Sequence, residues 1–151
     1  MTTVLAVDLG SASGRVLAGT LTDGRLDVTD IHRFKHEARR RADGTLTWDV
    51  ATMEAETIIG LKKALEQFPD AKTVSIDTWG VDWAPLDDNG ELVGDVIAYR
   101  DERTSRTLDA FRDRIADREF FDLTGNQPAT INTANQLFAF LREDPEGAAR
   151  V

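Results

Sequence analysis

The residues from Asp8 to Arg15 combine the side chains and the backbone that a metal-bound polyphosphate requires. An apolar run ends in the carboxylate of Asp8, a polar turn with Gly10 and Gly14 follows, and Arg15 begins a second apolar run. Backbone amides between the glycines can form an anion nest, and Arg15 adds a fixed positive charge. A carboxylate such as Asp8 can hold Mg²⁺ through water, because this cation keeps much of its hydration. The segment predicts a phosphate- and metal-binding turn, and an ordinary hairpin with a Gly- and Ser-rich turn is the alternative.

The two glycines in this turn exclude two common phosphate motifs. The spacing of Gly10 and Gly14 fits neither the dinucleotide fingerprint nor the P-loop, and no Gly-Lys-Ser or Gly-Lys-Thr follows. We expect both glycines to lie where the backbone bends and a side chain would clash.

A second group of reactive residues runs from Asp77 to Trp83. Trp79 and Trp83 could stack on the apolar face of a sugar ring, and Asp77 or Asp82 could accept hydrogen bonds from its hydroxyls. Gly80 would let a ligand approach the backbone closely. The alternative is a pair of core tryptophans beside a turn with capping carboxylates.

Apolar periodicity predicts the elements that position these two groups. The predicted strands are 3–8, 15–21, 26–34 and 73–76, and a helix is expected over 50–67 with Asp49 as its N-cap. An Asp-Gly pair within 22–25 is a hairpin signal, and Pro69 ends the helix. Three antiparallel strands followed by a crossover helix and a parallel strand match the ribonuclease H-like core of actin-type ATPases. The predicted fold class is therefore α/β with a mixed sheet.

The remaining segments are predicted as loops, short strands and helices. We expect a solvated loop over 35–44 because charge runs face water, a short strand over 46–48, a turn over 87–90 and helices over 104–115, 118–123 and 132–142. The residues expected to face inward are Met53, Ile58, Leu61 and Leu65 in the first helix and Ala134, Leu137, Phe138 and Leu141 in the last.

Composition limits the class of partner. The chain has 151 residues, a formal net charge of −9 and 41% hydrophobic residues. The negative charge argues against nucleic acid, whose affinity comes from Lys and Arg. The chain has no cysteine, which excludes disulfides and Cys-based zinc sites. We see no signal peptide and no apolar run long enough for a membrane span, so we expect a cytoplasmic protein.

Segments spread along the chain match one family in order and spacing. The matching residues are Val7-Asp8-Leu9-Gly10 with Ser13-Gly14-Arg15, Ile31-His32-Arg33-Phe34, Thr47-Trp48-Asp49-Val50, Ile76-Asp77-Thr78-Trp79-Gly80-Val81-Asp82, Tyr99-Arg100-Asp101 with Arg103-Thr104, Gly125 with Gln127, Asn132-Thr133 and Gln136-Leu137. On these residues the chain resembles the amino-terminal part of the FGGY carbohydrate kinases, and the run from Asp77 to Asp82 resembles their rhamnulokinase branch.

The resemblance implies a two-lobed, actin-like ATPase that uses ATP and Mg²⁺ to phosphorylate a sugar, most closely L-rhamnulose to L-rhamnulose 1-phosphate. It assigns ATP contacts to Ser11, Ala12, Ser13, Gly14 and Arg15, with Asp8 binding both the nucleotide and the metal through water. It assigns substrate contacts to Gly80 and, beside it, to Asp77, Trp79 and Asp82, with Asn132 and Gln136 on the sugar side.

The resemblance also implies a longer parent chain, about three times the present length, with the catalytic aspartate beyond residue 151. We therefore expect residues 1–151 to form an incomplete FGGY amino-terminal domain, strand-rich over about 1–97 and helical over about 98–151, that lacks kinase activity by itself. The alternatives are a kinase for another ketose or polyol, or a non-catalytic module that binds a sugar or nucleotide.

Overall fold

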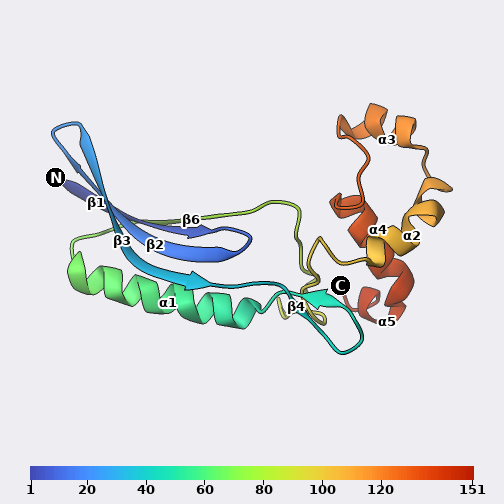
Figure 1. Cartoon of the computed structure of the whole chain (residues 1–151), viewed down its shortest axis with the longest axis horizontal. Coiled ribbons are helices and arrows are strands. Elements are labelled where there is room, and N and C mark those ends of the chain that lie inside the picture. Colours follow the sequence, from blue (N-terminus) through green and yellow to red (C-terminus); the bar gives the residue numbers. More distant parts are fainter. The chain divides into compact units, whose positions relative to one another are not determined.

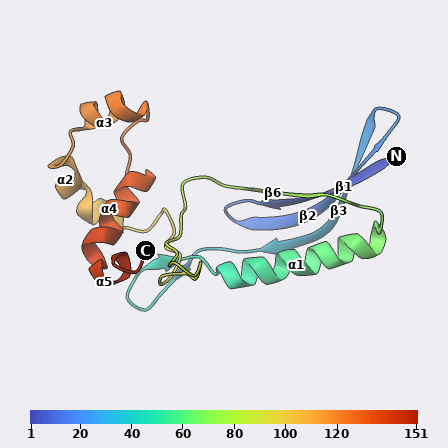
Figure 2. The same ribbon diagram turned by 180° about the vertical axis from the view of Figure 1, so that it is seen from behind.

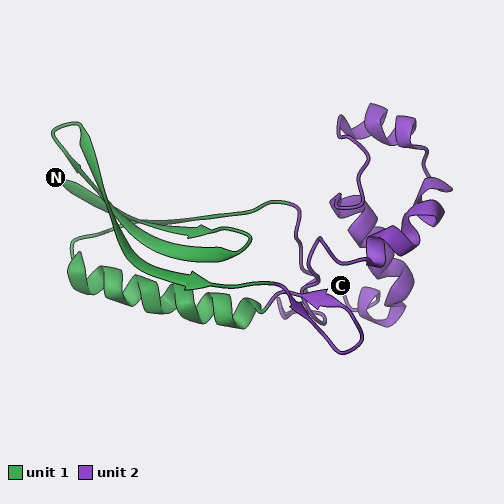
Figure 3. Ribbon diagram, in the orientation of Figure 1, with its two compact units in different colours: residues 1–37, 49–80 green, residues 38–48, 81–151 purple.

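The computed structural model describes all 151 residues, and they form two compact units. The first unit comprises residues 1–37 and 49–80, and the second comprises residues 38–48 and 81–151, as coloured in Figure 3. The first is an α/β unit, and the second combines four helices with a two-stranded sheet and loops. No helix in the chain has the length and apolar character that a membrane crossing needs.

A four-stranded mixed sheet forms the first unit. Its strands are β1 (Thr2–Leu9), β2 (Ser13–Thr22), β3 (Arg25–Lys35) and β6 (Val74–Thr78), in the order β3-β2-β1-β6. Neighbours among β1, β2 and β3 are antiparallel, whereas β6 runs parallel to β1 (Figure 1). The β2–β3 turn is made by Asp23 and Gly24, both with positive φ, as the Asp-Gly signal predicts. The predicted meander and its parallel fourth strand are confirmed.

One helix, α1 (Val50–Gln67), makes the crossover and covers a face of this sheet. It begins at Asp49, whose carboxylate accepts hydrogen bonds from the Thr52 amide at 3.0 Å and the Thr52 hydroxyl at 2.8 Å. It ends just before Pro69, which cannot continue a helix. Both predicted ends are confirmed.

Small residues bring α1 close to the sheet. Gly60 lies so near β2 that an added Cβ would be 2.4 Å from Cγ2 of Val16. Ala64 is fully buried in the same cluster as Val16. The predicted inward face is therefore partly wrong: Met53 is buried, but Ile58 and Leu65 are 43% and 48% exposed. The line through Gly60 and Ala64 faces the sheet instead, because only small side chains allow this separation.

The second unit starts with a small sheet where a loop was predicted. Strands β4 (Arg39–Arg40) and β5 (Leu46–Thr47) pair antiparallel, so the expected solvated loop over 35–44 is wrong in part, although the Arg39 and Arg40 residues are exposed. The four helices are α2 (Arg103–Arg112), α3 (Asp117–Thr124), α4 (Thr133–Glu143) and α5 (Pro145–Ala148). Helices α2 and α4 pack against each other (Figure 2).

Helix α4 buries a different face from the one predicted. Ala134, Leu137 and Leu141 are exposed, and Phe138 is half-buried against Phe111. The buried residues are Asn135, Gln136, Ala139 and Phe140. Two of these are amides, and their burial is possible because their side-chain N–H groups donate to backbone carbonyls.

Candidate functional site

Asp8 and Arg15 form an ion pair on the open face of the sheet. They are directly opposite each other in the β1–β2 ladder. Arg15 Nε donates to Asp8 Oδ2 at 2.7 Å, and a terminal guanidinium nitrogen lies 2.6 Å from the same oxygen. Alternation along the strands puts both on the face opposite Val7 and Val16, which are buried. Both side chains remain about two-fifths exposed, so a ligand can reach them.

A second carboxylate lies beside this pair. The parallel ladder between β1 and β6 places Asp77 opposite Asp8, on the same face and about 5 Å away by the usual strand spacing. The structure has no cluster of three or more His, Cys, Asp or Glu that could hold a metal. Two adjacent carboxylates fit Mg²⁺, which proteins hold with one or two carboxylates plus phosphates and water.

The turn between β1 and β2 is closed by a hydrogen bond from the Gly10 amide to the Ser13 carbonyl, at 2.9 Å. Neither Gly10 nor Gly14 has positive φ, so the turn does not need a left-handed backbone at either position. The expected clash of a side chain is confirmed at Gly14, where an added Cβ would meet the Phe34 ring. Ser11, Ala12 and Ser13, predicted to contact ATP, form the accessible part of this turn.

His36 joins this group, although no sequence pattern predicts it. Its amide donates to the Ala12 carbonyl at 3.3 Å, and its ring stacks on Trp79 with 5.5 Å between centroids. His36 is 8% exposed, and this burial lowers the pKa of its imidazole, an effect that interaction with the Gly10 backbone partly opposes. A single histidine in a polar stretch gives no sequence signal for this role; only the end of β3 brings it under the turn.

Trp79 and Gly80 follow β6 directly. The Trp79 amide donates to the Leu9 carbonyl at 3.2 Å, which fixes the residue beside the end of β1. One face of the indole is covered by His36, so the predicted stacking on a sugar would use the other face. No atom lies within 4 Å of a Cβ built on Gly80, which leaves the close approach expected for a ligand open.

Asp82, in the second unit, has protein donors on both carboxylate oxygens. Trp48 Nε1 donates to Oδ2 at 2.8 Å, and the Tyr99 amide donates to Oδ1 at 2.7 Å. The carboxylate thereby ties the 82–83 segment to β5 and to the loop that precedes α2. A contact with substrate stays a prediction for this residue.

Gln136 and Asn132 also act on the backbone of the second unit. Gln136 is 1% exposed, and its Nε2 donates to the carbonyls of Val81 and Ile131, both at 2.9 Å. Asn132 Oδ1 accepts from the Ala129 amide at 2.6 Å. Val81 has φ of +73°, which is strained for a β-branched residue. The structure thus shows a strained backbone at 81 held by Gln136, and sugar contacts by these two amides stay predictions.

The predicted site residues divide between the two units. Asp8, the turn from Ser11 to Arg15, Asp77, Trp79 and Gly80 belong to the first unit, where β1, β2 and β6 bring them together. Asp82, Asn132 and Gln136 belong to the second.

Comparison with known proteins identifies the family. Residues 3–151 match the FGGY family of carbohydrate kinases, N-terminal domain. The chain belongs to the FGGY family of carbohydrate kinases. This match covers nearly the whole chain and includes both groups of predicted site residues.

Curated relatives of this FGGY chain include several rhamnulokinases. It is 38% identical to the rhamnulokinase of Bacillus subtilis (strain 168) over 138 residues, which is 91% of this chain and 28% of that protein. It is 39% identical to the rhamnulokinase of Klebsiella pneumoniae (strain 342) over 144 residues, or 94% of this chain and 29% of that protein. The chain therefore spans less than a third of the length of these relatives.

Solved structures confirm the fold of the FGGY amino-terminal lobe. The xylulose kinase from Rhodospirillum rubrum superposes with a TM-score of 0.82 at 18% identity, over 99% of this chain and 31% of that one. The xylulose kinase from Lactobacillus acidophilus gives 0.81 at 13% identity, over 100% and 30%. At these identities the likeness establishes the α/β fold alone.

Proposed function

We propose that this chain supplies the phosphate-facing part of an ATP-dependent kinase that converts L-rhamnulose to L-rhamnulose 1-phosphate. One geometric observation supports phosphoryl transfer: Asp8, paired with Arg15, stands beside Asp77 at the edge of the turn between β1 and β2. This arrangement places oxygen ligands for a cation and a guanidinium for a phosphate at the same edge of the sheet. Identities of 36–39% to rhamnulokinases support the choice of sugar.

The chemistry follows from the usual needs of phosphoryl transfer, which are positioning and neutralisation of charge. Mg²⁺-ATP, when bound, supplies the transferable γ-phosphoryl group. Asp8 would hold the metal through water, and the amides and hydroxyls of the turn from Ser11 to Ser13 would bind phosphate oxygens. The ion pair with Arg15 holds the Asp8 carboxylate in one orientation before ligand arrives.

On the sugar side, the proposal assigns hydroxyl recognition to Asp77 and Asp82, with Gly80 allowing close approach and Trp79 offering its uncovered face. Asn132 and Gln136 would act there chiefly by shaping the backbone, given their hydrogen bonds to Ala129 and Val81. The partners of the protein are thus a sugar and ATP, and since ATP is the donor we expect a cytoplasmic enzyme.

The test is a coupled ADP-release assay on the protein expressed from its open reading frame, read to the stop codon. We expect turnover with L-rhamnulose to exceed that with D-xylulose or glycerol. Asp8→Asn should lower it by about a hundredfold or more, because a charge that neutralises the transition state is lost. Asp88→Asn is the matched control, since Asp88 is an exposed turn residue.

Equal activity with D-xylulose would reject the choice of sugar, and full activity in Asp8→Asn would reject the metal site. For the 151-residue chain alone we expect no turnover and a dissociation constant for ATP of about a millimolar or weaker, since each loss of ~1.4 kcal/mol in contacts weakens binding tenfold.

A further inference from the structure

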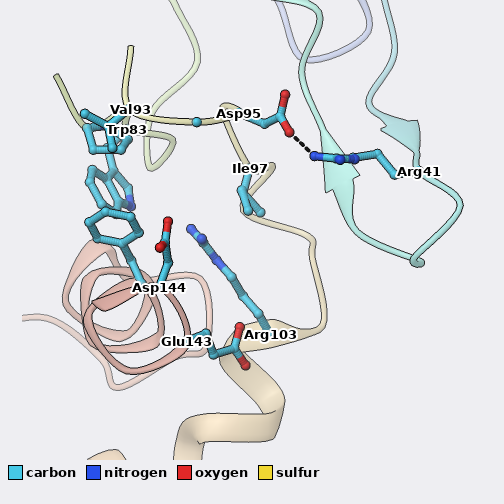
Figure 4. Close-up of a pocket in the computed structure, with 11 residues that line it drawn as sticks. Arg41, Trp83, Val93, Asp95, Ile97, Arg103, Glu143 and Asp144 are labelled. Atoms are coloured by element: carbon cyan, nitrogen blue, oxygen red, sulfur yellow. Dashed lines mark hydrogen bonds and ion pairs between the residues drawn. The ribbon is translucent and has the colours of Figure 1, made fainter. Parts of the chain in front are cut away.

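The second unit contains a cavity that the kinase site does not use. Its volume is about 290 Å³, close to the lower end of small-molecule pockets. Loop residues 83–97, Arg41, helix α2 and the end of α4 line it. Of the residues considered above for ATP or sugar, only Trp83 is among its lining residues. Figure 4 shows Trp83, Asp95, Arg103 and Asp144 around this space.

One wall of the cavity is aromatic. The rings of Trp83 and Phe140 meet edge to face, with 5.5 Å between centroids and an interplanar angle of 76°. Val93 and Ile97 add aliphatic surface. Such a wall favours a ligand with an apolar part.

The opposite wall carries a buried cation. Arg103 extends from the first turn of α2 into the cavity (Figure 4) and is 7% exposed. Its backbone amide donates to Asp101, but its guanidinium forms no hydrogen bond and no ion pair. Burial lowers the pKa of this guanidinium, while the charges of Asp101, Glu143 and Asp82 raise it. A guanidinium has five N–H donors, and that of Arg103 points toward the cavity (Figure 4), where an acceptor on a ligand could reach it.

A second donor beside the cavity also lacks a hydrogen-bond partner. Trp83 Nε1 is buried and has no hydrogen-bond partner. The acids that line the cavity, by contrast, already accept hydrogen bonds: Asp95 from Arg41, Glu143 from Arg106 at 3.4 Å, and Asp144 from the Gly147 amide at 2.8 Å. None of these acids accepts a hydrogen bond from the Arg103 guanidinium or from Trp83 Nε1, and an anionic oxygen of a ligand would supply that acceptor.

The charges of the lining favour a ligand with one negative charge over a ligand with two. Three carboxylates and two guanidinium groups surround the space, so a dianion such as phosphate would be repelled more strongly than a monoanion that contacts Arg103 directly. A carboxylate matches the planar fork of arginine and can accept two hydrogen bonds from it. We infer that this cavity binds a small monocarboxylate, with its carboxylate on Arg103 and its apolar chain against Trp83 and Phe140.

The indole N–H signal of Trp83 in a ¹⁵N-labelled chain reports on this site, and Trp83→Phe assigns it among the three tryptophans. The probes are butyrate, its neutral isostere butyramide, and inorganic phosphate. We expect a saturable shift with butyrate at millimolar concentration, and at least about tenfold weaker binding of butyramide and phosphate. Arg103→Lys should weaken butyrate about tenfold, because lysine keeps the charge and loses the fork.

Arg112→Lys is the matched control, being the same change on the same helix outside the cavity, and should bind butyrate as the parent does. A thermal melt shows whether each variant is folded; if Arg103→Lys is not, the comparison of butyrate with butyramide on the unchanged chain decides. No saturable shift with butyrate, an equal response to butyramide, or tighter binding of phosphate would each overturn the inference.

Discussion

Replacing Gln136 by leucine should release the strained backbone at Val81. The Gln136 side chain donates to the carbonyls of Val81 and Ile131, and leucine of similar size cannot. Each of the two carbonyls that loses its donor costs about 1–3 kcal/mol if it stays unsatisfied. Both residues that own these carbonyls are partly exposed, at 37% and 39%, so water would recover part of that cost.

The substitution also removes an unfavourable group, because Gln136 Oε1 is buried without a hydrogen-bond partner. Its removal should stabilise the fold by about 1 kcal/mol. The net expectation is a loss of about 2 kcal/mol in the free energy of unfolding. Urea unfolding followed by far-ultraviolet circular dichroism measures it. Leu137→Ala is the control: this neighbour on α4 is 42% exposed and its truncation should cost about 0.5 kcal/mol or less.

A double-mutant cycle separates the anchoring role from general packing. Glycine adopts positive φ without strain, so Gln136→Leu should cost about 1 kcal/mol less in a Val81→Gly background. Our reasoning is refuted if Gln136→Leu is as stable as the parent, or if the two changes are strictly additive.

Three further changes test the fold of the first unit. Gly60→Ala should destabilise the chain by about 1 kcal/mol or more despite the higher helix propensity of alanine, because the new Cβ would meet Val16. In a double variant, Val16→Ala should relieve that clash. Urea midpoints measure both effects, and a Gly60→Ala variant more stable than the parent would contradict the packing. Asp49→Ala should cost about 1 kcal/mol in thermal or urea unfolding through loss of the N-cap to Thr52, and no loss would show that this cap is dispensable. Burial lowers the pKa of His36 in the folded chain, so the unfolded chain binds the proton more readily and stability should fall as pH drops below about 6.5. His36→Phe should reduce this loss of stability, measured by urea midpoints at pH 7.5 and 5.5. If the difference between the two midpoints is the same in the variant as in the parent, His36 is excluded as its source.

Helix α1 and the β2–β3 hairpin were predictable because their signals are local. An aspartate at the N-cap, a proline past the last turn and an Asp-Gly pair each act within a few residues, through hydrogen bonds or backbone sterics that no distant segment needs to supply. The predicted bounds of α1, 50–67, agree with the structure residue for residue.

The buried faces of α1 and α4 were only partly predictable, since periodicity counts apolar side chains and ignores the partner surface. On α1, the separation from β2 is set by Gly60 and Ala64, which leaves Ile58 and Leu65 outside. On α4, the largest fully buried side chain is that of Gln136, and its acceptor at Val81 lies 55 residues away in the sequence. Burial of an amide depends on such distant carbonyls, which a local pattern cannot reveal.

By itself the sequence determined the family, and residue type and order predicted which residues form the first candidate site. The turn after Asp8, with Arg15 at its end, and the run from Asp77 to Gly80 were recognisable from residue type and order alone. The expectation that Asp8 and Asp77 share one edge of the sheet also followed from strand ends in the sequence. Tertiary structure decided that the two are directly opposite each other, because register depends on the pairing of β1 with β6 across a crossover helix. It also decided that Gly14 is needed for the Phe34 ring, and that His36 stacks on Trp79, since both contacts join segments that only the folded sheet brings together.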